Sequence, residues 1–274
     1  MNLAEKAAVL RKLHHQPSPV VFVNAWDGAS ARIVESLGFP AIATTSAGCA
    51  YVDGLPDGQA ISRAGMLAHV ATIAHAVALP VTADLEGGYG PTVADAVLTV
   101  CGALDAGAVG MNFEDSTTHD APLLSIEVQC ARIRAIRAAA ADRGVPFVIN
   151  ARTDVYRVRA REEEQFTEAV ARAKAYLDAG ADCIFVPFIA EEALIGRLAA
   201  AIPGPMNVLA GASTPDVATL ARLGVRRISL GSAPAAHLLA VFRRAALEVR
   251  DQGTYGFAGD RISHAELNQL LARS

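Results

Sequence analysis

Short apolar segments alternate with longer, alanine-rich segments along the whole of this 274-residue chain. A strand followed by a helix, repeated many times, is typical of a parallel sheet in which each helix leads back to the start of the next strand. Several helical segments are followed by a glycine, as in Ser36-Leu37-Gly38 and Asp178-Ala179-Gly180, and glycine is the usual residue just past a helix. Eight strands are predicted in this way: Val20–Val23, Ala41–Thr44, Pro80–Ala83, Val109–Phe113, Phe147–Ile149, Cys183–Val186, Met206–Leu209 and Arg227–Leu230.

Eight repeats without a break in composition favour a single (β/α)₈ barrel, the TIM barrel, over two separate domains. An open, doubly wound parallel sheet is the alternative fold. We therefore predict an α/β fold with one domain over residues 1–274. The glycine-rich segment Gly253–Gly259 interrupts the last long helix, and Ile262–Arg273 is predicted as a separate short helix. Residues 253–274 would then form a C-terminal helical extension.

Composition restricts the class of function. The chain is 52% hydrophobic, and its formal net charge of −4 gives no electrostatic reason to bind nucleic acid or an anionic membrane. No stretch reaches the roughly 20 apolar residues that a membrane-spanning helix needs, and the N-terminus lacks the apolar core of a signal peptide. The four cysteines are widely spaced without a CxxC pair, which favours a reducing compartment. We expect a soluble, cytoplasmic protein that acts on small molecules.

One segment, Asp84-Leu85-Glu86-Gly87-Gly88-Tyr89-Gly90, directly follows a predicted strand. Two carboxylates this close at the end of a buried strand raise each other's pKa, and they are costly to bury unless a positive charge lies on them. A divalent cation solves both problems, and ligands made only of oxygen suit Mg²⁺ or Mn²⁺. The glycines let the backbone turn tightly beside a ligand. This pattern predicts a metal-assisted active site.

Polar residues also follow other predicted strands. The active site of such a barrel lies at the carboxyl ends of the strands, so these residues are candidates for it. They are Asn24-Ala25-Trp26-Asp27, Thr45-Ser46-Ala47-Gly48, Glu114-Asp115, Asn150-Ala151-Arg152-Thr153-Asp154, Asn207 and Gly231-Ser232. Glu114 would bring a third acid to Asp84 and Glu86, and three converging acids without a cation would repel each other.

Four of these residues have a purely structural alternative. Asp27 and Asp115 are of the type that caps helices. Trp26, the only tryptophan, is also suited to packing in the core. Arg152 could form a structural ion pair with a buried acid.

In this order, the motifs resemble those of the isocitrate lyase and phosphoenolpyruvate mutase superfamily, over nearly the whole chain. The matching parts are Asn24-Ala25-Trp26-Asp27, Thr45-Ser46-Ala47-Gly48, Gly54-Leu55-Pro56-Asp57, the segment from Asp84 to Gly90, Asn112-Phe113-Glu114-Asp115 and Asn150-Ala151-Arg152-Thr153-Asp154. The resemblance implies a Mg²⁺-dependent barrel that acts on small 2-oxo acids or dicarboxylates and breaks or moves a C–C or P–C bond. It also implies a homo-oligomer, a dimer or tetramer, in which the eighth helix is swapped between subunits.

The resemblance further implies which residues hold the metal. Asp84 is similar to the direct metal ligand, and it would also border the substrate. Asp57, Glu86 and Glu114 would hold the metal through its water molecules, which fits a cation that loses water reluctantly.

The other matching residues would bind the substrate. Ser46, Ala47 and Gly48 would present backbone N–H groups, and Ser46 its hydroxyl, to a carboxylate or enolate oxygen. Arg152 would grip a carboxylate with two parallel hydrogen bonds. Trp26 would form a wall of the pocket, and Asn207 would reach the far end of the substrate.

One loop departs from the family pattern. The family's lyases carry a motif of the Lys-Arg-Cys-Gly-His type there, whereas this chain reads Ser116-Thr117-Thr118-His119-Asp120-Ala121-Pro122-Leu123-Leu124. The lysine and asparagine of the mutase-type loop are missing as well. His119 is the candidate for the missing catalytic acid, because its pKa suits proton transfer. A solvated loop histidine is the alternative.

Three functions stay open. The first is a Mg²⁺-dependent lyase that cleaves or decarboxylates 2-oxo acids or their adducts through an enolate of the pyruvate type, as in methylisocitrate cleavage or oxaloacetate decarboxylation. The second is P–C chemistry, as in a phosphonopyruvate hydrolase or phosphonomutase, and the loop without cationic groups weakens it. The third is a protein that binds a 2-oxo acid without catalysis.

Overall fold

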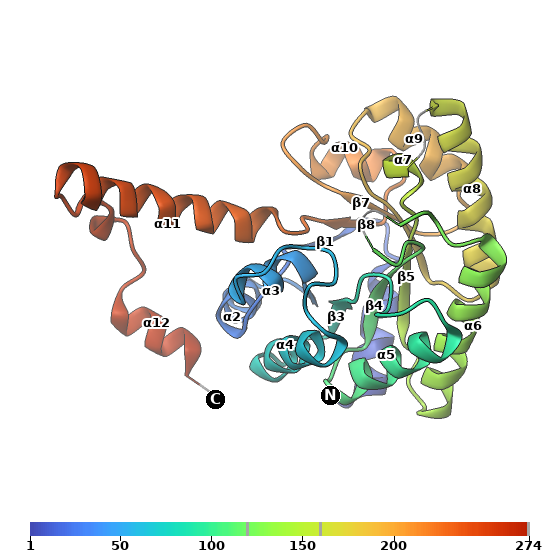
Figure 1. Ribbon diagram of the computed structural model, residues 1–274, viewed down its shortest axis with the longest axis horizontal. Helices are drawn as coiled ribbons and strands as arrows, with labels where there is room; N and C mark the ends of the chain where they lie inside the picture. Colours follow the sequence, from blue (N-terminus) through green and yellow to red (C-terminus); the bar gives the residue numbers. More distant parts are fainter. Residues whose placement is uncertain (119–120, 159–160, 273–274) are drawn as a thin grey trace.

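Eight parallel strands form a barrel at the centre of the molecule (Figure 1). The computed structural model describes residues 1–118, 121–158 and 161–272. The strands follow the order β1-β8-β7-β6-β5-β4-β3-β2, and a parallel bridge between Ala25 and Thr44 joins β1 to β2. The predicted (β/α)₈ barrel is therefore confirmed. The strands are β1 (Val20–Phe22), β2 (Ile42–Ala43), β3 (Val81–Asp84), β4 (Gly110–Glu114), β5 (Val148–Arg152), β6 (Cys183–Val186), β7 (Met206–Leu209) and β8 (Arg227–Ser229).

Helices cover the outside of the barrel, and local sequence signals set their ends. Serine, threonine or aspartate side chains cap several N-termini, among them Ser62 before α4, Thr92 before α5 and Asp216 before α10. Gly38 and Gly180, predicted as helix stops, have the left-handed backbone typical of that position, with φ of +81° and +110°. The helices are α1 (Leu3–Leu13), α2 (Gly28–Ser36), α3 (Ser46–Val52), α4 (Arg63–Ala76), α5 (Val93–Asp105), α6 (Ile126–Asp142), α7 (Val155–Val158), α8 (Glu162–Asp178), α9 (Glu192–Ala201), α10 (Val217–Arg222), α11 (Ala233–Gln252) and α12 (His264–Leu271).

The strands end slightly later than predicted on the side where the acids lie. Asp84 is the last residue of β3, Glu114 the last of β4 and Arg152 the last of β5. The sheet register pairs Asp84 with Asn112 and Glu114 with Arg152. Because these residues belong to the strands themselves, the backbone ladder fixes where their side chains start.

Helix α1 packs against the amino-terminal end of the barrel. A side chain at Gly110, the first residue of β4, would come within 2.9 Å of Leu10, so α1 needs a glycine there to approach the barrel. His14, just past α1, is buried and its Nε2 accepts a hydrogen bond from Arg227 Nη1 at 3.2 Å. The amino-terminal end of the barrel therefore contains a buried hydrogen-bonded pair, His14 and Arg227.

The C-terminal segment leaves the barrel. Helix α11 projects away from it, and α12 turns back toward α2 after the short 3₁₀ helix η1 (Gly256–Gly259) (Figure 1). Arg32 on α2 holds α12 by donating to the carbonyls of Leu270 and Ala272. Ala235 is buried on α11, whereas Phe242 is 71% exposed. The glycine-rich interruption predicted at Gly253–Gly259 is thus present.

No helix within the described ranges combines the length and apolar character needed to cross a bilayer.

Candidate active site

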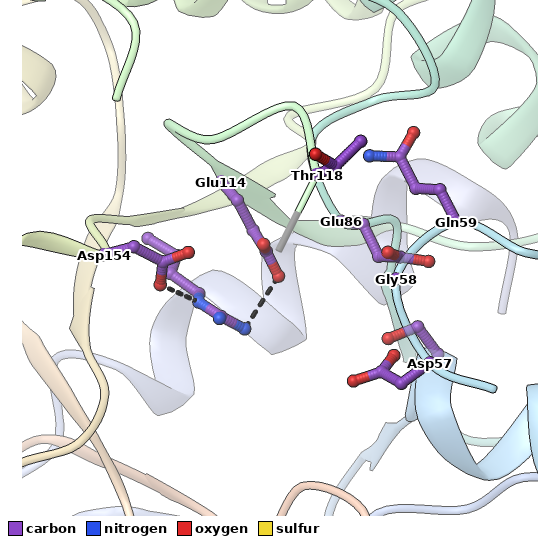
Figure 2. Close-up of a pocket in the computed structure, with 9 residues that line it drawn as sticks. Asp57, Gly58, Gln59, Glu86, Glu114, Thr118 and Asp154 are labelled. Atoms are coloured by element: carbon purple, nitrogen blue, oxygen red, sulfur yellow. Dashed lines mark hydrogen bonds and ion pairs between the residues drawn. The ribbon is translucent and has the colours of Figure 1, made fainter. Parts of the chain in front are cut away.

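Two adjoining cavities open at the carboxyl ends of the strands. We call the larger one, about 210 Å³, the central cavity, and its wall includes Asp84, Arg152 and Ser229. We call the smaller one, about 40 Å³, the acidic pocket; Figure 2 shows Asp57, Glu86 and Glu114 around it. Residues that line both cavities are Ser46, Asp57 and Arg152. The polar residues predicted at the strand ends therefore converge on one place.

Asp84 is fixed by hydrogen bonds on both of its carboxylate oxygens. The backbone N–H and the hydroxyl of Ser46 donate to Oδ2 at 2.9 and 2.8 Å, and Asn112 Nδ2 donates to Oδ1 at 3.2 Å. The backbone N–H of Asp84 donates to the hydroxyl of Thr44 at 2.8 Å. The carboxylate is thus oriented before any ligand binds.

The amide of Asn112 has a fixed orientation. Its Oδ1 accepts hydrogen bonds from Asn150 Nδ2 at 2.7 Å and from Arg227 Nη2 at 3.2 Å, which leaves Nδ2 to donate to Asp84. Arg227 is fully buried, and burial lowers its pKa to about 10. A chain of hydrogen bonds therefore runs through the barrel from His14 to Asp84.

Glu86 is a buried acid in a strained backbone. Its φ is +50°, a region that side chains other than glycine seldom adopt, and it is 7% exposed. Burial, followed by the nearby charges of Asp84 and Asp57, raises its pKa to about 8. A backbone hydrogen bond from Gln59 favours the charged form. The side-chain amide of Gln59 donates to the Thr117 carbonyl, so two loops meet over Glu86.

The loop after Asp84 is held by a buried cation. Arg132 on α6 donates to the carbonyls of Gly87 and Gly90, and its guanidinium lies 4.5 Å from the Phe113 ring centre. A Cβ at Gly87 would come within 2.3 Å of the Ser116 carbonyl oxygen. The glycine run therefore serves close backbone packing, and the sequence alone did not identify Arg132.

Arg152 lies between two acids. Its Nη1 contacts Glu114 at 2.7 Å and its Nε contacts Asp154 at 2.7 Å. Burial raises the pKa of Glu114 well above its usual value, and Arg152 only partly offsets this. Burial also raises the pKa of Asp154, but its ion pair with Arg152 outweighs that and the net pKa is lowered. The ion-pair alternative for Arg152 is therefore present, and a substrate carboxylate would meet an arginine already bound on two nitrogens.

The helix-cap alternative holds for Asp27 and is wrong for Asp115. Asp27 caps α2, where its Oδ1 accepts from the Ser30 N–H at 2.7 Å. Asp115 is completely buried and links two segments instead of capping a helix: it accepts from the Asp154 N–H before α7, and from Arg172 and the Tyr176 hydroxyl on α8. These two acids therefore have structural roles in the segments around the site.

The segment Ser46-Ala47-Gly48 starts α3 beside the central cavity, where Ser46 and Ala47 line the wall. Its backbone is partly engaged, because the Ser46 N–H donates to Asp84 and the Gly48 N–H donates to the Thr45 hydroxyl at 3.3 Å. A Cβ at Gly48 would come within 2.8 Å of the Trp26 Cβ. Trp26 is half-buried and packs beside α3, outside the described lining of both cavities.

Two further candidates lie elsewhere. Asn207 is fully buried in β7 and pairs with the hydroxyl of Ser229, which itself lines the central cavity. Asn207 therefore supports the floor of the cavity from below. His119 lies outside the described residues.

The sequence analysis did not identify two residues that line the central cavity at the carboxyl end of β6. Phe185 and Phe188 both line the central cavity, and each ring centre lies 5.7 Å from the Arg152 guanidinium. The rule that strand ends carry the site, applied to β6, would have pointed to Phe188. Gln59 gave no such signal, because its position depends on a left-handed backbone with φ of +63°.

The donor set fits a hydrated Mg²⁺ ion. Among the described residues, no three His, Cys, Asp or Glu side chains lie close enough to bind a metal together. Asp84 is preoriented, and Asp57 and Glu86 line the small acidic pocket. Burial, followed by the charges of Asp84 and Asp57, raises the pKa of Glu86, which a bound cation would counteract. Mg²⁺ commonly binds one or two carboxylates and keeps several waters. The residues therefore suit direct binding by Asp84 and water-mediated binding by Asp57, Glu86 and Glu114.

Comparison with known proteins agrees with this geometry. The chain is 30% identical over 278 residues to 2,3-dimethylmalate lyase of Eubacterium barkeri, covering 97% of this chain and 93% of that protein. The crystal structure of a candidate lyase/mutase from Burkholderia cenocepacia J2315 superposes with a TM-score of 0.92 and 37% identity, over 99% of this chain and 97% of that chain.

A second solved structure is an enzyme with its product bound. Oxaloacetate acetylhydrolase in complex with oxalate superposes with a TM-score of 0.88 at 26% identity, over 98% of this chain and 94% of that one. The family model for phosphoenolpyruvate phosphomutase matches residues 10–250. The chain therefore belongs to the phosphoenolpyruvate phosphomutase family, within the isocitrate lyase and phosphoenolpyruvate mutase superfamily.

Proposed function

We propose that this protein is a Mg²⁺-dependent carbon–carbon lyase that acts on a small 2-oxo acid or its adduct, by cleavage or decarboxylation. The observation that carries the proposal is that Asp84, Asp57 and Arg152 line one cavity, with Glu86 in the adjoining acidic pocket. Lyases and mutases of the same superfamily, among them 2,3-dimethylmalate lyase, act on small organic acids.

The side chains would divide the work between them. A bound Mg²⁺ ion would polarise the 2-oxo carbonyl and stabilise negative charge on its oxygen. Asp84, Asp57, Glu86 and Glu114 would hold this ion. Arg152 would face the substrate carboxylate. The Ala47 N–H, between the engaged N–H groups of Ser46 and Gly48, would favour a developing oxyanion.

Burial and its acidic neighbours raise the pKa of Glu86 to about 8, and it lines the acidic pocket. A bound cation would relieve this repulsion, which supports the role of Glu86 in holding Mg²⁺. His119, which lies outside the described residues, stays the candidate for proton transfer. Water could also supply the proton in a decarboxylation.

The test is a panel of substrates followed by NMR. Purified protein with Mg²⁺ would be offered oxaloacetate, isocitrate, 2-methylisocitrate, 2,3-dimethylmalate and phosphonopyruvate. Pyruvate, glyoxylate or succinate should form with the wild type and not with Asp84→Ala or Arg152→Ala. Full activity in either variant would refute the assigned mechanism, and Arg134→Ala, on the exposed face of α6, is the control.

P–C chemistry is the second candidate, favoured by the description of the matching family model. Among the described residues lining the two cavities, Arg152 is the cationic side chain, and it is paired with two acids. A phosphonate would need more positive charge than this. Conversion of phosphonopyruvate in ³¹P spectra would select this candidate. Mg²⁺-dependent oxalate binding without turnover of any compound would instead favour a non-catalytic binding protein.

We also infer a homo-oligomer, a tetramer or dimer, in which α11 is swapped between subunits. The support is the exposed apolar surface of α11, which includes Leu238, Leu239 and Phe242. The one-domain organisation over residues 1–274, with 253–274 as an extension, and the cytoplasmic location expected from the cysteines stay predictions. All four cysteines are free thiols.

A further inference from the structure

A third cavity, larger than the two described above, adjoins the central cavity. It has a volume of about 550 Å³, within the range of roughly 300–1,000 Å³ typical of small-molecule sites. Its wall is drawn from three segments that follow consecutive strands: 188–190 after β6, 209–214 after β7 and 230–233 after β8. We call it the apolar chamber, because these segments contain no charged residue.

The chamber borders the proposed catalytic site. Phe188, Leu209 and Ser232 line both the apolar chamber and the central cavity. A molecule held near Asp84 and Arg152 would therefore enter the chamber past these three residues.

Phe188 stands at the junction in an unusual conformation. Its φ is +65°, which is a genuine outlier for a bulky side chain, and the residue is 53% exposed. The ring centre lies 5.7 Å from the Arg152 guanidinium. The backbone thus holds a large apolar ring over the charged site, in a position where a ligand would bury it. Backbone strain of this kind is concentrated at ligand sites.

The charges of the joined space lie at one end. Asp57, Asp84 and Arg152 line the central cavity, while the chamber offers only hydroxyls, such as that of Thr214, which already accepts a hydrogen bond from the Gly211 N–H at 3.0 Å. A carboxylate placed in the chamber would lose water without gaining a cationic partner, which is costly. An alkyl or aryl group would gain from the same burial.

We propose that the substrate carries an uncharged apolar group on the carbon chain beyond its 2-oxo acid head, and that this group occupies the apolar chamber. This inference rests on the proposed function, since that function places the head between Asp84 and Arg152. It excludes dicarboxylates with a distal charged end as the preferred ligands.

Binding of a homologous series tests the proposal. Calorimetry with the full-length protein and Mg²⁺ would compare pyruvate, 2-oxobutanoate, 2-oxopentanoate and 2-oxohexanoate. Each added methylene should tighten Kd by up to about fourfold. A second comparison uses 5-methyl-2-oxohexanoate and 2-oxoglutarate, which share one shape and differ in the distal charge. The uncharged compound should bind at least tenfold more tightly; equal or tighter binding of 2-oxoglutarate would overturn the proposal.

A charge placed in the chamber should reverse this preference. Ser213 is exposed and lines the chamber, so Ser213→Arg adds a cation there with little effect on the core. This variant should favour 2-oxoglutarate, whereas Leu98→Arg, on the exposed face of α5, should leave the wild-type order unchanged. An unchanged order in Ser213→Arg would count against the chamber.

Oxalate tests the proposed function separately from the apolar chamber, because it resembles the 2-oxo acid head group and has no carbon chain beyond it. Mg²⁺-dependent oxalate binding combined with a flat chain-length series would refute the chamber alone. This outcome would also be expected if a neighbouring subunit filled the chamber. Absence of any oxalate binding would refute the proposed function and the chamber together.

Discussion

Arg227 Nη2 donates a hydrogen bond to Asn112 Oδ1 at 3.2 Å, in the fully buried interior of the barrel. This contact fixes the orientation of the Asn112 side-chain amide. Its carbonyl oxygen Oδ1 accepts from Arg227, so its Nδ2 group is left to donate. The donor end then faces Asp84. A cation buried at the amino-terminal end of the strands thereby orients the Asp84 carboxylate at their carboxyl end.

Replacing this arginine should loosen the proposed metal site without unfolding the barrel. In Arg227→Met, a side chain of comparable size removes the buried charge, and the loss of the donor to His14 Nε2 should cost about 1–3 kcal/mol of stability. Loss of one hydrogen bond, worth about 1 kcal/mol, should weaken Mg²⁺ binding by roughly fivefold. Calorimetric Mg²⁺ titration checks this, with Arg226→Met as the neighbouring control. Unchanged Mg²⁺ affinity in a folded Arg227→Met protein would contradict the orienting role.

Arg152 should not tolerate lysine. The guanidinium reaches Glu114 and Asp154 with different nitrogens, and a single ammonium group cannot keep both contacts while facing a substrate. We expect Arg152→Lys to weaken oxalate binding by at least tenfold at saturating Mg²⁺. Arg134→Lys, on the surface of α6, should behave as the wild type. Wild-type oxalate affinity in Arg152→Lys would show that the arginine is only structural.

His14 should make the protein sensitive to acid. Burial lowers its pKa to about 3, and the neighbouring charge of Arg227 acts in the same direction. An unfolded histidine has a pKa of roughly 6.5, so as the pH falls the unfolded chain takes up the proton first. The stability that neutral His14 provides is complete above that pH and is lost between about 6.5 and 3.

Urea denaturation at pH 7 and pH 4.5 measures this effect. The free energy of unfolding should fall by roughly 2.5 kcal/mol more in the wild type than in His14→Gln, which cannot take up the proton. The same loss in both proteins would assign the acid sensitivity to other groups.

Gly48 should be intolerant of a methyl group. A Cβ there would lie 2.6 Å from the Thr45 side chain and 2.8 Å from Trp26, so the start of α3 would have to move. We expect Gly48→Ala to lower the free energy of unfolding by about 1–3 kcal/mol. The control is Gly28→Ala, where the closest contact would be an ordinary 3.5 Å. Equal stability of the two variants would contradict the close packing of α3.

Charges on α11 should dissociate the inferred oligomer. Leu238 and Phe242 are 53% and 71% exposed, which suits contact with another subunit. Sedimentation should show a multiple of the 28.5 kDa chain mass for the wild type, and a smaller assembly for Leu238→Glu combined with Phe242→Glu. The matched control is Leu98→Glu on α5. A wild-type protein that sediments as a monomer would remove the swapped-helix inference.

The architecture was predictable from the sequence because it depends on a repeated pattern. Eight apolar segments with glycine stops define the strands, and strand order then places Asp84, Glu114 and Arg152 at one end of the barrel. The convergence of these residues follows from topology and does not require knowledge of any contact distance. The loop at Asp57 lines the acidic pocket together with Glu114 and Arg152.

The supporting contacts were not predictable, because they depend on distances between residues remote in sequence. Arg132 lies 42 positions from Gly90 and holds its carbonyl at 2.8 Å, yet in the sequence it is one arginine among several on a helix. Arg227 is similar, since nothing local marks it as buried beneath Asp84. The ion pairs of Arg152 were foreseen only as an alternative, because the sequence does not say which acid an arginine will meet.

Within the described ranges, four residues other than glycine have a left-handed backbone: Gln59, Glu86, Tyr89 and Phe188. Three of them line the cavities, and the fourth lies in the loop that follows Asp84. Each such conformation costs about 1–2 kcal/mol, out of a total stability of roughly 5–15 kcal/mol. Laboratory evolution for heat resistance alone would therefore select glycine at these positions. The resulting barrel would be more stable, and its pocket would lose the side chains that shape it. A thermostabilisation library should keep all four constant.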